Sequence, residues 1–127
     1  MDMTENQILA SIAPPLRETV LEHCQSAMLV AETPLAEAGE TVDTVYFPES
    51  SVISIVSTYH DGATIEVANV GREGCTGVGL VLGSSQALIS SVVQVSGQSL
   101  TMSAKTFSHL KRTIPEFEVA INASVQG

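Results

Sequence analysis

The chain has 127 residues, of which 44% are hydrophobic and 15% are charged; this composition supports a folded core and excludes intrinsic disorder. The length corresponds to one domain that needs neither a disulfide nor a metal for stability. Five Lys and Arg against fourteen Asp and Glu give a formal charge of −9. This charge repels nucleic-acid phosphates, so the chain alone is not expected to bind DNA or RNA.

The N-terminal residues and the cysteines predict where the protein resides. The stretch MDMTENQ is acidic and polar, unlike a secretion signal, and no run reaches the roughly 18 apolar residues of a membrane-spanning helix. Cys24 and Cys75 lie in separate predicted elements without a Cys-x-x-Cys spacing, which favours reduced, packed thiols. We therefore expect a cytoplasmic protein that does not contact a membrane.

Two short helices are predicted near the N-terminus. Thr4 and Gln7 have the spacing of a capping box, and apolar residues follow on one helical face as far as Ile12. Pro14 and Pro15 interrupt this helix, and they suit the first turn of a second helix.

Most of the remaining chain consists of short runs rich in β-branched residues, which predict strands. The central runs are residues 42–47, 52–59 and 63–70, and the Asp61-Gly62 pair supplies the positive φ angles of a hairpin turn. Further strands are predicted at residues 28–32, 89–95 and 99–103. Seven or eight short strands separated by glycine-containing turns indicate a jelly roll or a barrel.

The chain closes with two predicted helices. Ser103 is placed to cap a helix over residues 104–112, and Thr113 with Glu116 forms a second capping box that opens the last helix. The apolar residues of that last helix share one face, four positions apart: Phe117, Ile121 and Val125.

The order of these elements, together with two motifs, resembles a known family. The motifs are YFPES at residues 46–50 and VGREG at residues 70–74. They resemble the N-terminal cyclic-nucleotide-binding-like sensor domain of the Crp/Fnr transcriptional regulators, over nearly all 127 residues. The resemblance implies a mainly β fold with flanking helices, a double-stranded β-helix (jelly roll) of the cyclic-nucleotide-binding-domain type.

The resemblance also implies how such a domain acts. In the family, a dimerisation helix and a helix-turn-helix follow the sensor domain, so residues 115–127 correspond to the start of the dimerisation helix. No helix-turn-helix is found in this chain, which is expected to be a fragment, and DNA would be bound only through a C-terminal domain absent from it. Because Phe117, Ile121 and Val125 would be exposed in a monomer, we expect a homodimer through this face.

The family's nucleotide site is incomplete in this sequence. Members that bind cyclic nucleotides use a Gly-Glu pair for the ribose and, further along the loop, an arginine for the cyclic phosphate. Here Gly77 is followed by Val78, and no Arg or Lys occurs between Arg72 and Lys105. A desolvated phosphate needs a fixed cation, for which arginine offers a bidentate fork. We therefore expect no binding of cyclic AMP or cyclic GMP.

A different effector, either a small molecule or a protein, is expected at the glycine-rich loop. Its candidate ligand-binding residues are Gly71, Arg72, Glu73, Gly74, Gly77 and Val78. The alternative interpretation, which the residues of this loop favour, is a surface turn in which Arg72 and Glu73 are solvated or tie the loop to a neighbouring strand.

No metal, cofactor or catalytic group is predicted. Two isolated cysteines do not supply a four-thiolate cluster, and His23, His60 and His109 lack a metal-binding spacing. There is no nucleophile elbow, and His60 with Glu66 does not complete the metal-binding set of a cupin-type enzyme.

The sequence thus favours a non-enzymatic sensor domain of a Crp/Fnr-type regulator, degenerate at the cyclic-nucleotide site. The alternative is a stand-alone ligand- or protein-binding module with no transcriptional role. Cys75, beside the glycine-rich loop, is expected to be packed, with a redox-sensitive thiol as the other possibility.

Overall fold

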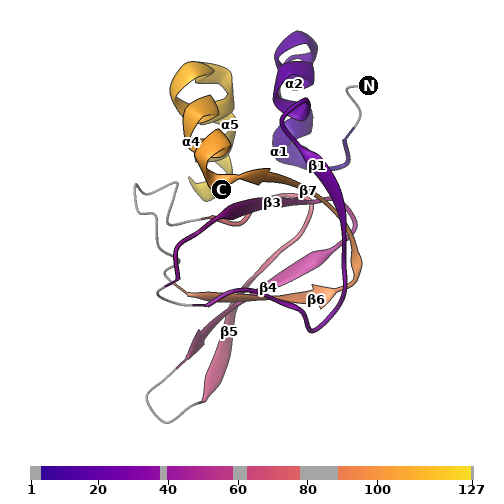
Figure 1. The fold of residues 1–127 in the computed structure, drawn as a ribbon, viewed down its shortest axis with the longest axis vertical. Helices are drawn as coiled ribbons and strands as arrows, with labels where there is room; N and C mark the ends of the chain where they lie inside the picture. The colour runs from indigo at the N-terminus through magenta and orange to yellow at the C-terminus, as the bar shows by residue number, and fades with distance from the viewer. Residues whose placement is uncertain (1–3, 38–39, 59–62, 78–88, 127) are drawn as a thin grey trace.

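The computed structural model describes residues 4–37, 40–58, 63–77 and 89–126 (Figure 1). Its helices are α1 (Gln7–Ala10), α2 (Pro14–Leu21), α4 (Ala104–Thr113) and α5 (Pro115–Gln126). Its strands are β1 (Gln25–Leu29), β2 (Pro34–Ala36), β3 (Thr44–Pro48), β4 (Val52–Thr58), β5 (Thr64–Val70), β6 (Ser90–Val95) and β7 (Gly97–Ser103). The hairpin turn predicted at Asp61-Gly62 lies outside the described residues.

The strands form two antiparallel sheets, which confirms the predicted β roll. One sheet has the order β1-β7-β3, and the other has the order β2-β6-β4-β5. The helices gather over the first sheet, while the second sheet lies on the opposite side of the roll (Figure 1). The fold is therefore mainly β with flanking helices, as the sequence predicted.

Strand β3 separates two apolar cores because its side chains alternate between its faces. Val45 and Phe47 are fully buried in the core beneath the helices, where their cross-strand partners on β7 are Met102 and Leu100. Tyr46 faces the other way and packs in the smaller core inside the roll. A displacement of β3 would therefore change the packing of both cores.

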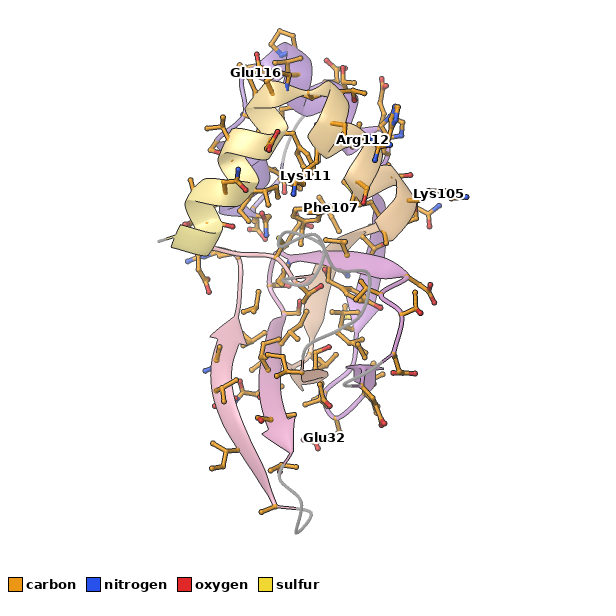
Figure 2. All side chains as sticks on the ribbon, turned by 90° about the vertical axis from the view of Figure 1, so that its left-hand side faces the viewer. Glu32, Lys105, Phe107, Lys111, Arg112 and Glu116 are labelled. Atoms are coloured by element: carbon orange, nitrogen blue, oxygen red, sulfur yellow. The ribbon has the colours of Figure 1, made fainter. Side chains whose placement is uncertain are left out.

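Three phenylalanines join the helices to the sheet. Phe107 of α4 and Phe117 of α5 meet edge to face with ring centroids 5.6 Å apart. The ring centroid of Phe47 lies 6.4 Å from that of Phe107 and 6.5 Å from that of Phe117. Phe107 points from α4 towards the roll, whereas Lys105 on the same helix points away from it (Figure 2). This aromatic cluster, Phe47, Phe107 and Phe117, fixes α4 and α5 on the roll.

The expectation that Phe117 and Ile121 are exposed in a monomer is wrong. Both side chains are fully buried within the chain, because α5 packs back on α4 and α1. The outward face of α5 instead carries Val119, which is 68% exposed, and Ala123. The side chain of Val125 lies outside the described residues.

The predicted helix caps are partly corrected. Ser103 caps α4, as expected, by accepting from Thr106 N at 3.1 Å. Helix α1 is capped by Asn6, not Thr4, whose hydroxyl donates to Glu49 Oε2 at 2.9 Å. Thr113 does not open α5, since it ends α4 and its hydroxyl donates to His109 O at 2.9 Å.

The first strand lies earlier than predicted. It spans Gln25–Leu29 and not residues 28–32, because the chain turns at Ala31 and Glu32, where Glu32 has a φ of 76°. The short edge strand β2, which begins at Pro34, follows this turn and was not predicted.

Candidate functional site

The roll encloses an open cavity of about 410 Å³. Its walls come from β2 to β6, from the segment 40–43 that leads into β3, and from residues 75–77 after β5. A volume of this size lies within the range of small-molecule pockets.

Much of the cavity wall is apolar. The aliphatic side chains come from strands β2, β4 and β5 of the second sheet and from the residues that directly precede β3 and β6. The main apolar lining residues are Leu35, Val42, Ile55, Val67, Val70 and Ile89. This surface would bury the apolar body of a ligand.

A β-bulge shapes one edge of the cavity. Along the β4–β5 ladder, Ile55 pairs with Ala68 while the next residue, Val56, pairs with Glu66, so Val67 has no partner. A bulge of this kind redirects side chains. As a result, the neighbouring residues Val67 and Ala68 both line the cavity.

The polar lining groups are hydroxyls and carboxylates. They are Glu40, Thr41, Asp43, Thr44, Tyr46, Thr76 and Ser91. No Lys, Arg or His occurs among the described residues that line the cavity. The site therefore carries negative charge at its rim, where Glu40 and Asp43 are exposed.

Thr76 and Tyr46 connect the 75–77 segment to β3. Tyr46 N donates to Thr76 Oγ1 and Thr76 N donates to Tyr46 O, each at 3.0 Å. Gly77 follows with a φ of 98°, which glycine adopts without strain. Burial raises the pKa of the Tyr46 phenol, which keeps it neutral.

The structure separates the six predicted ligand-binding residues. Of these, Gly77 lines the cavity, Val78 lies outside the described residues, and the four residues of the turn 71–74 do not line the cavity. The turn supports α1 instead: Gln7 N donates to Arg72 O at 2.6 Å, and Asn6 Nδ2 donates to Gly74 O at 2.9 Å.

The side chains of this turn match the alternative interpretation of a surface turn. Arg72 and Glu73 are exposed, and Glu73 Oε1 accepts from Gly71 N at 3.0 Å. The acidic and hydroxyl residues that line the cavity were not predicted as site residues from the sequence. The alternation of residues 42–47 was the available signal, because it places Thr44 and Tyr46 on one face.

The two cysteines are free thiols, and both residues are partly buried. Burial raises the pKa of the Cys75 thiol to about 12, and burial together with the charge of Glu49 raises that of Cys24 to about 11. A protonated thiol is a poor nucleophile, so these values favour packed cysteines over a redox-sensitive Cys75. Among the described side chains, no three metal-binding groups lie close enough together to hold an ion.

Comparison with known proteins identifies the fold. No protein-family model matches the sequence, and no curated protein is significantly similar to it. Solved structures do match. A cyclic nucleotide-binding domain from Methylobacillus flagellatus superposes with a TM-score of 0.75 at 12% identity, covering 96% of this chain and 72% of that one.

Two transcription regulators are equally similar in structure. The catabolite activator protein of Thermus thermophilus has a TM-score of 0.76 at 18% identity, covering 94% of this chain. The c-di-GMP responsive global regulator CLP of Xanthomonas campestris has a TM-score of 0.73 at 19% identity, covering 86% of this chain. This chain spans 56% of each regulator's length.

The TM-scores establish the fold, whereas sequence identities of 12–19% do not identify the ligand. None of the described helices has the length and hydropathy needed to cross a bilayer. The two sheets, the flanking helices and the structural matches agree that the chain has the cyclic-nucleotide-binding-domain fold, which regulators of the Crp/Fnr type also contain.

Proposed function

We propose that this chain is the effector-binding sensor domain of a Crp/Fnr-type transcription regulator whose cavity does not accept cyclic AMP or cyclic GMP. The domain has no catalytic role in this proposal, needs no metal or cofactor, and works in the cytoplasm. The observation that carries the proposal is an acidic cavity without a lining cation among the described residues, in a fold shared with regulators.

Electrostatics supports the loss of cyclic-nucleotide binding. A buried phosphate requires charge-assisted hydrogen bonds. Arg72 precedes the lining residues 75–77 in the chain, but it lies on the exposed turn that supports α1. Glu40 and Asp43 at the rim repel an anion.

The two cores provide a route from the cavity to α5. Tyr46 lines the cavity, and its neighbour Phe47 contacts Phe117 of α5 across 6.5 Å between ring centroids. A ligand that favours one position of β3 would therefore favour one position of α5. In the complete regulator, this helix would relay the change to a DNA-binding domain outside the present residues.

We also propose a homodimer, but through the outward face of α5 that carries Val119 and Ala123. Sedimentation at tens of micromolar tests this. Val119→Lys should shift the population towards monomer, while Met28→Lys, at a similarly exposed site on β1, should leave it unchanged. A monomeric parent protein would contradict the proposed dimer.

Isothermal titration with cyclic AMP and cyclic GMP tests the ligand side of the proposal. No binding is expected up to millimolar nucleotide. Micromolar affinity would contradict the proposal, since it would require a phosphate-binding cation, which the described cavity residues do not include. A parallel NMR screen of neutral and charged fragments should locate binding at the cavity residues Ile55 and Val70.

A further inference from the structure

We propose that the cavity binds a cationic amphiphile, a small molecule with an apolar body and a protonated amine. This inference rests on the proposed effector-binding function and names the chemical class of the effector. The apolar wall, the acidic rim and the inward-facing hydroxyl groups each specify one part of such a ligand.

The apolar body is specified by the interior wall. Ile55 and Val70 belong to the small core of the roll and also line the cavity, as does Leu35 from the opposite edge of the sheet. The cavity volume of about 410 Å³ is large enough for an aromatic or branched aliphatic group.

The positive charge is specified by the rim. The carboxylate of Asp43 forms no hydrogen bond or ion pair with any described residue. The backbone carbonyl of Asp43 accepts a hydrogen bond from Ala104 N at 2.8 Å. Glu40 uses Oε1 to accept from Glu37 N at 2.6 Å, which leaves Oε2 facing solvent or a ligand. The two carboxylates, with no cation among the described lining residues, attract an ammonium group and repel a phosphate or a carboxylate.

Two buried hydroxyls and one ring provide further contacts. Ser91 is nine-tenths buried and shares the inward face of β6 with Val93. Its backbone pairs with β2 and β4, whereas its hydroxyl lines the cavity without a hydrogen bond to a described residue. Thr76, also nine-tenths buried, accepts from Tyr46 N, and its own hydroxyl proton is available to a ligand. The ring of Tyr46 lines the same cavity, and aromatic faces attract organic cations.

The test is an NMR titration with three probes that share one apolar body: phenylbutylamine, phenylbutanol and phenylbutyrate. The amine should bind about three- to tenfold more tightly than the alcohol, with the carboxylate weakest, and all shifts should centre on Ile55, Tyr46 and Val70. Asp43→Asn should remove most of the preference for the amine while leaving the affinity for the alcohol unchanged.

Glu18→Gln on the exposed surface of α2 is the matched control, because it changes the net charge equally and lies on a helix that does not line the cavity. An equal loss of preference in both variants would overturn the assignment to Asp43. Cavity binding of the carboxylate as tight as that of the amine would overturn the cationic ligand while leaving the effector site intact. Failure of all three probes at the cavity would overturn the inference and count against the effector site as well.

Discussion

Tyr46 and Thr76 form a reciprocal pair of hydrogen bonds at the wall of the cavity, each with a donor–acceptor distance of 3.0 Å. One bond joins two backbone groups, and the other uses the hydroxyl of Thr76 as the acceptor for the Tyr46 N–H. Thr76 is only 8% exposed, so water does not readily replace the side chain. The pair therefore holds the 75–77 segment against β3.

Replacing Thr76 with valine should lower the free energy of unfolding by about 1–3 kcal/mol, because it leaves a buried backbone N–H without its acceptor while keeping the side-chain volume. Thr76→Ser retains the hydroxyl and should cost less than Thr76→Val. Urea denaturation followed by circular dichroism measures both. Equal stability of the valine and serine variants would show that the hydroxyl makes no net contribution.

Asn6 should be among the most sensitive polar positions. Its fully buried side chain accepts from Ile8 N and Leu9 N, and its amide donates to Pro48 O at 2.8 Å and Gly74 O at 2.9 Å. Asn6→Ala should lower the free energy of unfolding by about 2–4 kcal/mol, since it removes a helix cap and leaves two carbonyls unsatisfied.

Asn69→Ala on the exposed face of β5 is the control for this change and should alter stability by less than about 0.5 kcal/mol. Thermal unfolding measures both variants. A small effect at Asn6 would mean that water satisfies the exposed backbone groups.

The cap of α1 shows why some parts of the fold could be predicted from the sequence and others could not. The strands and helices follow from local periodicity, which the sequence carries directly. The cap of α1 does not, because Asn6 was selected over Thr4 by carbonyls 42 and 68 positions away in the chain. Element type is a local property, whereas the fate of one polar side chain depends on tertiary contacts.

The candidate site was harder to predict for the same reason. The ligand was predicted at the glycine-rich turn 71–74, but the backbone carbonyls of this turn accept hydrogen bonds from the start of α1. Asp43, Tyr46 and Ser91 line the same cavity because the sheet that contains β3 lies opposite the sheet that contains β6 (Figure 1). Alternation along residues 42–47 and 89–95 was the only local signal, and it places Tyr46 with Thr44 and Ser91 with Val93 without indicating that the two strands face one cavity.

Phe117 provides a test of the corrected role of α5. Phe117→Ala should lower the free energy of unfolding by about 3–5 kcal/mol, because it empties the centre of the aromatic cluster. Val119→Ala on the outward face of the same helix should change the free energy of unfolding of the monomer, measured at low protein concentration, by less than about 0.5 kcal/mol. Denaturation at several protein concentrations separates the loss of core packing from any loss of dimer. Similar values for the two variants would contradict the burial of Phe117.

The thiol of Cys75 should make stability fall at high pH. Its pKa is raised from 9.0 to about 12 in the folded chain, so the protonated form is favoured by folding. This contribution is fully present below pH 9.0 and is lost progressively as the pH rises towards about 12. The urea midpoint should therefore decline more steeply over this window in the parent protein than in Cys75→Ala. Rapid labelling of native Cys75 by iodoacetamide near neutral pH would contradict the buried thiol.

Gly97 should be intolerant of any side chain, because of a close backbone approach. A Cβ at this position would lie 2.6 Å from the carbonyl carbon and oxygen of Ser50 and 2.7 Å from Ser51 N. These are backbone atoms, and they are held in place because Ser50 N and Ser51 N both donate to Gln98 O. Gly97→Ala should therefore lower the free energy of unfolding by about 1–3 kcal/mol or more through forced displacement of the chain.

Gly74→Ala is the matched control, since its nearest neighbour would be a side-chain methyl of Val70 at 3.4 Å, an ordinary contact distance. Its effect should be clearly smaller than that of Gly97→Ala. Thermal unfolding of both variants checks the difference. Equal stability would mean that the 49–51 segment moves away from β7 at little cost, and the close approach at Gly97 would then not be required for the junction between the two sheets.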